Sequence, residues 1–560
     1  MRREVSVVNK KVCSFPILFA LLALVVGTCA VVFPASAQAA PTSTGSITVS
    51  GTVASRYDAY QIFSANVVDG DSDAKIATDL AWASDAVRDA ALPVLHSAGM
   101  PNSQTTAQEA AEWLNTDSHL TSALSAQLAR SLQSSGARPA ALNAGTTAEL
   151  PCGYWLIVAD DDAISQNEAG TAPIMALVGG GAVTVKPKAS TPKVSKHVLE
   201  DSTAAWQKAA DATVADDLYW RLSATVPAGL AAYDTYTVRF VDTMSAGLDP
   251  SKVAASMRVY VAAGADGGFD AVSCEGGSAS STPAKGWTDI TSQCRVSVEG
   301  KAFTVRTGDL IAALGGADAF TAGARVVAVY NAPLNSACNH GIAKGNPNEV
   351  YLRYPRSPFA DQSGDAGFTR TPSDDACAYT WDLALTKRGS DGDKPLAGAV
   401  LSIADDRGRT LAADGTWDAE GKATVTTGED GRVTVSGVDS GKLEVRELKA
   451  PKGYTAFKGT RSVTVKAEGL DVDQVAAAKP KLTITAESPL RADSADGSTG
   501  SLEASLINTP TGTPPSITTG GFMPSTGDMA MYAAAAAAVA GAALIVVALL
   551  VKRGGGSHKE

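Results

Sequence analysis

The chain has 560 residues, a net charge of −11 at pH 7 and 19% charged residues. This length is enough for several domains, and the negative charge argues against nucleic acid as a partner. The composition, rich in glycine and apolar residues, suits extracellular β-domains. The histidines are scattered without the spacing of metal ligands, so neither a metal nor another cofactor is expected.

Residues 1–39 have the pattern of a secretory signal peptide. Arg2 and Arg3 precede an apolar run at residues 15–33. Small residues at 35–37 or at 37–39 offer alternative cleavage sites. We therefore expect an exported mature chain that begins near residue 40.

Residues 40–188 predict an α+β domain. Apolar alternation predicts strands near its start, and residues 75–135 predict two or three helices because apolar residues recur there at spacings of three and four. Strands are expected again before the domain ends. The expected strands are 45–49, 57–63, 154–158, 174–178 and 182–185, and the clearest helical segments are 106–114 and 120–132.

Two β-rich blocks follow, at residues 189–370 and 377–509, and each opens with a lysine on an apolar strand face. Lys196 alternates with valines, and Lys387 alternates with leucines and a tryptophan. A lone buried lysine is costly unless it is compensated. The alternative is a lysine at a strand end whose amine reaches solvent.

The last block also places an acid and an amide on its apolar faces. Asn508 shares the face of Leu506, and Glu447 shares the face of Val445. Together with Lys387 they form a set of amine, carboxamide and acid in one predicted core.

The preceding block repeats this set. Asp242 shares the face of Phe240, and Asn348 shares the face of Val350. Asn346 has the same parity as Asn348, so either asparagine could be the partner of Lys196.

Such a set can form an intramolecular isopeptide bond. Burial lowers the pKa of a lysine and raises that of an acid. A neutral amine can attack the carboxamide, and the acid can polarise the amide and relay protons while ammonia leaves. The predicted bonds join Lys196 to Asn348 with Asp242 assisting, and Lys387 to Asn508 with Glu447 assisting.

These positions lie in segments that resemble Gram-positive major pilins. Residues 443–454 resemble the pilin E-box, whose glutamate, here Glu447, assists isopeptide formation. Residues 242–248 and 345–352 resemble the segments that carry the acid and the closing strand of the pilin middle domain. The resemblance implies a CnaA-type and then a CnaB-type domain, both immunoglobulin-like β-sandwiches.

Residues 183–188 resemble the pilin motif whose last lysine receives the next subunit, with Lys186 in place of the usual tyrosine. Period-2 alternation directs Lys188 outward, unlike Lys196. The resemblance implies that Lys188 is the intersubunit acceptor. The alternative is a solvated lysine in an interdomain linker.

After a Pro/Gly/Thr-rich linker at 510–522, residues 523–560 combine a pentapeptide, an apolar run at 529–551 and a basic tail. About 20 apolar residues can cross a bilayer, and the cations after them stay in the cytoplasm. This order resembles a cell-wall sorting signal, and implies cleavage by a sortase within the pentapeptide. An ordinary single-pass anchor is the alternative. The pentapeptide is Met523, Pro524, Ser525, Thr526 and Gly527.

Five cysteines remain in the mature chain, and some should pair in an exported protein. Cys274 with Cys294 and Cys338 with Cys377 are the candidate disulfides, which leaves Cys152 over. Sequence alone does not prove this connectivity.

The resemblance covers nearly the whole mature chain and implies the backbone subunit of a covalently polymerised, wall-anchored pilus that mediates adhesion. It is not expected to be an enzyme, because no catalytic constellation can be assembled. The same resemblance implies the partners: a pilus-specific class C sortase, identical subunits, accessory pilins, and a housekeeping sortase with peptidoglycan. An accessory or basal pilin, or a singly anchored adhesin built from the same domains, is the alternative.

Overall fold

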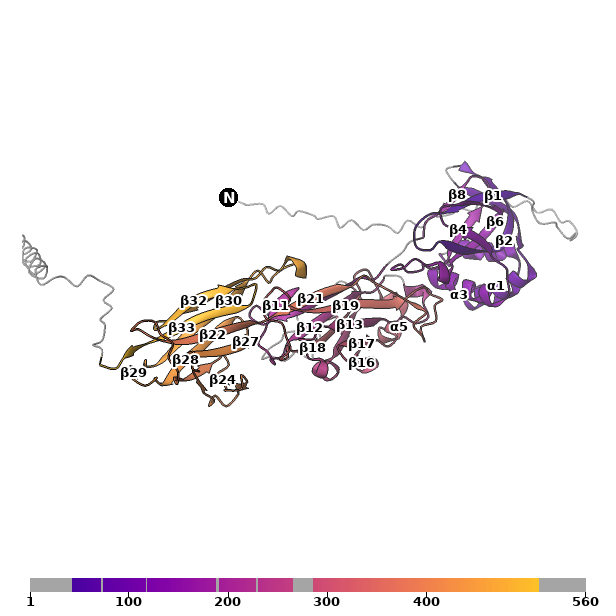
Figure 1. The fold of residues 1–560 in the computed structure, drawn as a ribbon. Coiled ribbons are helices and arrows are strands. Elements are labelled where there is room, and N and C mark those ends of the chain that lie inside the picture. The colour runs from indigo at the N-terminus through magenta and orange to yellow at the C-terminus, as the bar shows by residue number, and fades with distance from the viewer. Residues whose placement is uncertain are drawn as a thin grey trace, which may run out of the picture.

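The computed structural model describes residues 43–71, 74–116, 118–187, 191–227, 230–264 and 286–512. These residues form an elongated row of three domains, which we call the N-terminal (43–187), middle (191–379) and C-terminal (381–512) domains (Figure 1). Strands dominate, and the three longer helices of the described chain all lie in the first domain. The expected mainly β class, with an α+β domain first, is confirmed.

The N-terminal domain has a five-stranded sheet covered on both faces. The strand order is β3-β2-β6-β7 with β4 beside β2, and a three-stranded sheet, β5-β1-β8, packs on one face through an apolar cluster. The helices pack on the other face through a second cluster. The elements are β1 (Thr44–Val49), β2 (Arg56–Asp69), β3 (Lys75–Trp82), α1 (Asp85–Ser97), α2 (Ala107–Asn115), α3 (Ser122–Ser134), β4 (Ala140–Asn143), β5 (Thr147–Pro151), β6 (Gly153–Ala159), β7 (Ile174–Val178) and β8 (Val183–Val185).

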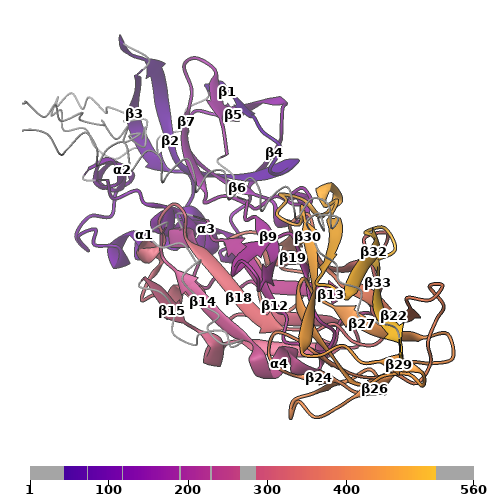
Figure 2. The ribbon, with the colours of Figure 1, turned by 90° about the vertical axis from the view of Figure 1, so that its left-hand side faces the viewer.

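Side chains just before each helix cap the free backbone N–H groups of its first turn. Thr106 and Glu109 form a reciprocal capping box at the start of α2, and Ser84 and Thr121 cap α1 and α3. Figures 1 and 2 place α1 and α3 on the side of the domain nearest the middle domain. There, Arg130 of α3 donates a hydrogen bond to the Ala232 carbonyl oxygen at 2.8 Å.

One part of the helical prediction is wrong. Lys75–Trp82 forms strand β3, which pairs antiparallel with β2 around an irregularity between Ser64 and Asn66. This segment lacks the turn residues that usually mark a strand, so pairing with its neighbour determines its conformation. The helices begin only at Asp85.

The middle domain is a sandwich of two sheets around one large core. One sheet has the order β10-β9-β12-β18-β14-β15, and the other has the order β11-β21-β19-β13-β17-β16 with β20 beside β19. The elements are β9 (Val194–Glu200), β10 (Ala205–Gln207), β11 (Ala209–Asp211), β12 (Tyr219–Thr225), β13 (Arg239–Met244), α4 (Val253–Ser256), β14 (Arg258–Ala262), β15 (Trp287–Asp289), β16 (Arg295–Glu299), β17 (Ala302–Arg306), α5 (Leu310–Ala313), β18 (Arg325–Asn331), β19 (Asn346–Pro355), β20 (Phe368–Arg370) and β21 (Asp374–Tyr379).

The C-terminal domain is a second sandwich with its own core. Its first and last strands, β22 and β33, lie side by side and parallel, with Lys387 opposite Leu506. The sheets are β27-β22-β33-β29 with β32 beside β33, and β25-β24-β23-β28-β30-β31 with β26 beside β23. The elements are β22 (Trp381–Gly389), β23 (Val400–Ala404), β24 (Thr410–Leu411), β25 (Trp417–Asp418), β26 (Val425–Thr426), β27 (Arg432–Val438), β28 (Gly441–Lys449), β29 (Tyr454–Thr455), β30 (Thr460–Glu468), β31 (Lys481–Ala486), β32 (Leu490–Asp496) and β33 (Ser501–Pro510).

The division between these two domains differs from the expected one. Strand β21 pairs with β19 and β11 of the middle domain, so residues 374–379 do not open the third domain. Only Thr380 separates β21 from β22, and no change of composition marks the boundary. The C-terminal domain therefore begins at Trp381 rather than at residue 377.

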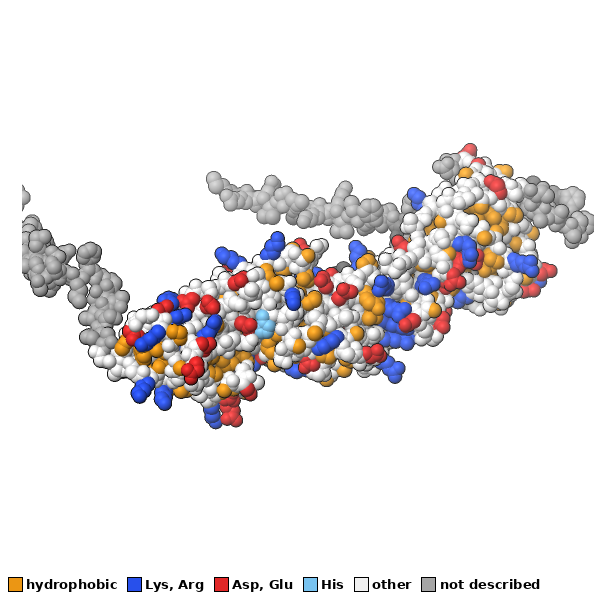
Figure 3. All heavy atoms as spheres, in the orientation of Figure 1, with side chains coloured by type: hydrophobic (Ala, Val, Ile, Leu, Met, Phe, Trp, Pro, Cys, Tyr) orange, Lys and Arg blue, Asp and Glu red, His pale blue; other side chains and the backbone are white. Residues whose placement is uncertain are grey.

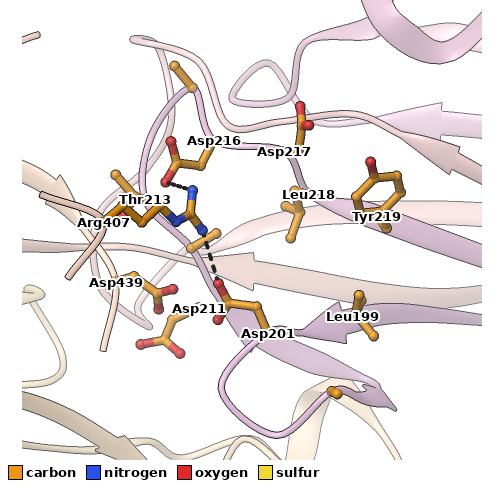
Figure 4. A pocket seen from close by; sticks show the side chains of 13 residues that line it. Leu199, Asp201, Asp211, Thr213, Asp216, Asp217, Leu218, Tyr219, Arg407 and Asp439 are labelled. Atoms are coloured by element: carbon orange, nitrogen blue, oxygen red, sulfur yellow. Dashed lines mark hydrogen bonds and ion pairs between the residues drawn. The ribbon is translucent and has the colours of Figure 1, made fainter. Parts of the chain in front are cut away.

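The middle and C-terminal domains meet through buried carboxylates. Asp211 of β11 accepts hydrogen bonds from the Trp381 indole at 2.6 Å and from the Ser440 backbone at 3.0 Å. Beside it, a pocket of about 750 Å³ contains Arg407, which forms an ion pair with Asp216 at 2.9 Å (Figure 4). The junction thus joins side chains from both domains and is not a flexible linker.

Burial and neighbouring charge perturb the acids at this junction. Burial, aided by Asp211, raises the pKa of Glu200 to about 7. Burial also raises the pKa of Asp201 and, well above its ordinary range, that of Asp439. Several carboxyl groups in one buried site cannot all ionise at low cost.

The junction should therefore be more stable at mildly acidic pH. A carboxyl whose folded pKa is raised stabilises the fold at low pH, and that stability is lost as the pH rises through the folded pKa. We expect the free energy of unfolding of the mature protein to fall by roughly 1–3 kcal/mol between about pH 5 and pH 7, and its unfolding temperature in calorimetry to fall with it. The Glu200→Gln variant should lose much of this dependence. An identical pH profile in wild type and variant would contradict the assignment.

Candidate functional site

Three predicted residues of the middle domain meet in its core. The side chains of Lys196 on β9, Asp242 on β13 and Asn348 on β19 are all fully buried. The Lys196 Nζ forms an ion pair with the Asp242 Oδ2. Strand β9 belongs to one sheet and strands β13 and β19 to the other, so the cluster bridges the two layers of the sandwich.

The hydroxyl of Tyr330 joins all three groups. It accepts hydrogen bonds from the Lys196 Nζ at 2.9 Å and from the Asn348 Nδ2 at 2.8 Å. It donates to the Asp242 Oδ2 at 3.0 Å. One phenol has one donor and two acceptor positions, and this arrangement uses all of them.

Apolar walls shift the pKa of both charged groups. The Lys196 amine lies 5.5 Å from the ring centres of Trp220 and Tyr330. Burial, partly offset by Asp242, lowers the pKa of Lys196 to about 8. Burial raises the pKa of Asp242, although Lys196 opposes this. Both shifts reduce the cost of moving a proton from the amine to the carboxylate.

Two oxygen atoms at this cluster have no hydrogen-bond partner within the described part of the chain. They are the Asn348 Oδ1 and the Asp242 Oδ1. Leaving a buried polar atom unpaired costs roughly 1–3 kcal/mol. A protonated Asp242 could supply the missing donor to a carboxamide oxygen, which is the polarisation that amine attack requires.

The neighbouring Asn346 has a different role. Its Nδ2 donates to the Asn339 carbonyl at 2.8 Å and to the Ala378 carbonyl at 3.2 Å. Its Oδ1 accepts from the Asn339 backbone N–H at 2.8 Å. The Asn346 side chain therefore bonds to the backbone at Asn339 and on β21, whereas Asn348 contacts the Tyr330 hydroxyl that also binds the lysine.

The C-terminal domain contains a parallel arrangement. Lys387 on β22 and Asn508 on β33 are buried, and Glu447 on β28 faces them from the opposite sheet. The Asn508 Nδ2 donates to the two Glu447 carboxylate oxygens at 2.8 and 3.1 Å. The Lys387 Nζ lies 3.7 Å from the Glu447 Oε1 and donates to the Leu506 carbonyl at 3.1 Å.

The register places this amine and this amide together. Lys387 is opposite Leu506 in the parallel pair, and Asn508 follows two residues later on the same face. Burial lowers the pKa of Lys387 to about 8, with Glu447 opposing the shift. The Asn508 Oδ1 has no hydrogen-bond partner within the described residues. Here the acid itself contacts the asparagine, without an intervening tyrosine hydroxyl.

Sequence reasoning missed Tyr330. Its strand is buried on both faces, and Val326, Ala328 and Tyr330 alternate on the face in the main core. A hydroxyl on an apolar face is the same type of signal as the two inward lysines. This tyrosine did not stand out in the sequence, because tyrosine is common in protein cores and its hydroxyl needs only one hydrogen-bond partner there.

Several predicted residues cannot be placed. Lys188, the pentapeptide 523–527, the apolar run 529–551 and Cys274 lie outside the described residues. Lys186 and Thr184, on the face predicted for Lys188, are exposed. Across the described ranges, no helix is both long and apolar enough to cross a membrane.

The expected Cys338–Cys377 disulfide is corrected, because both thiols are free. Cys338 packs with the core of the middle domain and Cys377 with that of the C-terminal domain. The Cys338 sulfur lies 3.6 Å from the His340 Nε2, and the His340 Nδ1 lies 2.8 Å from the Asp382 Oδ1. Asp382 raises the pKa of His340 to about 10, so this charged pair links the two domains.

This arrangement makes a prediction for thiol chemistry. Alkylation of the unfolded, unreduced mature protein should label Cys152, Cys338 and Cys377, because none is in a disulfide. Peptide mass spectrometry measures the labelling, and a reduced sample is the control. Labelling of Cys338 and Cys377 only after reduction would contradict the structure.

Comparison with known proteins finds a family match within the C-terminal domain. Residues 382–479 match the family described as the SpaA prealbumin-like fold domain. A curated relative, the trypsin-resistant surface T6 protein of Streptococcus pyogenes serotype M6, is 30% identical over 143 residues. That alignment covers 24% of this chain and 24% of the relative, so about a quarter of each protein is compared.

Solved structures of similar proteins include a backbone pilin and a full-length major pilin. The T6 backbone pilin of Streptococcus pyogenes serotype M6 is 17% identical, with a TM-score of 0.46, over 84% of this chain and 98% of that chain. The major pilin SpaD of Corynebacterium diphtheriae is 15% identical, with a TM-score of 0.40, over 84% and 98%. The family match at residues 382–479 lies in the C-terminal block, whose motifs resemble those of pilins.

Proposed function

We propose that the chain is the backbone subunit of a covalently polymerised, cell-wall-anchored pilus. One observation carries this proposal: each of two successive β-sandwiches buries a lysine, an acid and an asparagine in contact or near-contact. Uncompensated buried lysines are rare, and the same set occurring twice favours a chemical purpose over chance. The chain acts as a structural protein whose own chemistry is self-cross-linking.

In the middle domain the reaction joins Lys196 to Asn348. The neutral Lys196 Nζ attacks the Asn348 Cγ while a protonated Asp242 polarises the carboxamide oxygen. The C–Nδ2 bond breaks, and the nitrogen leaves as ammonia after taking the proton that the amine gives up through Asp242. Tyr330, whose hydroxyl contacts all three side chains, positions the amine and the amide.

In the C-terminal domain the same reaction joins Lys387 to Asn508, with Glu447 as the acid. The Glu447 carboxyl already contacts the Asn508 amide nitrogen that becomes the leaving group. Folding supplies the proximity that otherwise limits an amine–amide reaction. The amine and the amide lie on neighbouring strands of one sheet, so little backbone movement is needed.

These bonds suit a protein that bears tension. The C-terminal bond ties the first strand of the domain to its last, the two strands through which a pull on both ends enters the fold. A cross-link that closes a loop of more than 100 residues restricts the unfolded chain by roughly 4–5 kcal/mol. Unlike a disulfide, an amide survives reducing conditions.

Polymerisation would use the two ends of the subunit. A class C sortase would cut between Thr526 and Gly527 and join the threonine carbonyl to Lys188 of an identical subunit. The C-terminal apolar run would hold the secreted chain in the membrane until cleavage. A housekeeping sortase would attach the finished polymer to peptidoglycan, and accessory pilins would complete it.

The cross-links predict a mass deficit. The intact mature protein should be lighter than its sequence by about 34 Da, because each bond releases one ammonia. Intact-mass spectrometry measures this, and Glu447→Ala should restore about 17 Da, one ammonia. Glu447→Gln keeps the side-chain volume but removes the acid. It should restore the same mass, which would assign the effect to the lost acid and not to misfolding. Full sequence mass in the wild type would refute the isopeptide assignment.

Polymerisation predicts a second result. Cells that express the chain with its sortase should produce a detergent-resistant ladder of multimers on immunoblots, and Lys188→Ala should abolish the ladder. Lys186→Ala, which removes an exposed lysine two residues earlier, is the matched control and should leave the ladder intact. Monomer alone in the wild type would instead favour a singly anchored adhesin.

A further inference from the structure

Five arginines form one row across the outer face of the middle domain. Their strands are adjacent in the sheet, and each arginine is paired directly with the next. Neighbouring strands lie about 4.8 Å apart, so the row extends roughly 19 Å. Direct opposition of like charges destabilises a sheet. In order, the row is Arg295, Arg306, Arg239, Arg353 and Arg370.

A loop of the same domain neutralises only the centre of the row. Asp365 forms ion pairs with Arg239 and Arg353, and the Gln362 carbonyl accepts from Arg306 at 3.0 Å. One carboxylate therefore pairs with two guanidinium groups. The centre of the row holds this loop in place, and the positive charge at its ends remains.

One end of the row opens into a pocket between the N-terminal and middle domains. The pocket has a volume of about 530 Å³ and contains Arg353, Arg370 and the nearby Arg356. Neither Arg356 nor Arg370 forms an ion pair within the described part of the chain. Figure 3 shows Lys and Arg side chains gathered where these two domains meet. A chain of net charge −11 thus concentrates cations at one hollow.

The remaining lining matches a ligand with both charge and hydroxyl groups. Ser165 and Gln166 come from the N-terminal domain, and Thr369 and Tyr351 come from the middle domain. The Arg370 guanidinium lies 5.2 Å from the centre of the Tyr351 ring, which fixes a flat cationic surface. A single exposed acid, Asp162, lies among the lining residues.

We propose that this pocket binds an acidic sugar residue through its carboxylate. Guanidinium groups bind carboxylates with paired, parallel hydrogen bonds. The hydroxyl and amide side chains would meet the sugar hydroxyls, and the tyrosine would meet an apolar face of the ring. The volume lies in the range of small-molecule sites and fits one or two sugar residues. This binding is independent of polymerisation, because both walls belong to one subunit.

Saturation-transfer NMR on the monomeric mature protein tests the site. Sialyllactose and glucuronate are the acidic probes, and lactose is the neutral control. We expect saturation transfer to at least one acidic probe and none to lactose, with binding that weakens as salt rises. Which acidic probe binds identifies the carboxylate source. Absence of transfer to both, or equal transfer to lactose, would overturn the proposal.

Paired variants locate the binding. Arg370→Gln and Arg356→Gln should each weaken binding at least about tenfold, the usual effect of losing a charged contact. Arg295→Gln removes an exposed arginine at the opposite end of the row and should change nothing. Circular dichroism confirms that each variant folds. Equal weakening by Arg295→Gln would indicate non-specific charge attraction and reject the pocket.

Discussion

The burial of a lysine amine inside each β-sandwich is the constraint on which the structure depends. A charged amine that is shielded from water requires a compensating acid. The lysine side chain points toward the opposite sheet, so the acid must come from that sheet. Lys196 meets Asp242 and Lys387 lies near Glu447 in this way. An asparagine completes each set. Strand order, register and sheet packing together bring the amine, the acid and the amide into contact or near-contact.

The two sandwiches satisfy this requirement differently. In the middle domain the lysine and the asparagine occupy different sheets, and the Tyr330 hydroxyl connects them. In the C-terminal domain the lysine and the asparagine lie on neighbouring parallel strands, and Glu447 contacts the amide directly. Similar side chains thus reach similar geometry from different topologies. The proposed cross-linking depends on local contacts and dielectric, and less on which strands supply the groups.

Charged and polar side chains also form the two domain junctions. Between the middle and C-terminal domains, buried carboxyl groups accept hydrogen bonds across the junction, and His340 forms a charged pair with Asp382. Between the N-terminal and middle domains, arginines exceed the acids that neutralise them. Junctions built from specific polar contacts hold the domains in a defined orientation.

Period-2 alternation predicted from sequence that Lys196, Asp242 and Asn348 face the core, as do Lys387, Glu447 and Asn508, and all six are buried. Alternation could not separate Asn346 from Asn348, because residues two apart share a face. It missed Tyr330, assigned a strand at 75–82 to a helix, and paired two cysteines that pack in different cores. The sequence by itself determined which faces carry charge, since that depends only on backbone geometry. The tertiary structure alone decided which groups meet, since strand pairing and sheet packing join residues more than 100 positions apart.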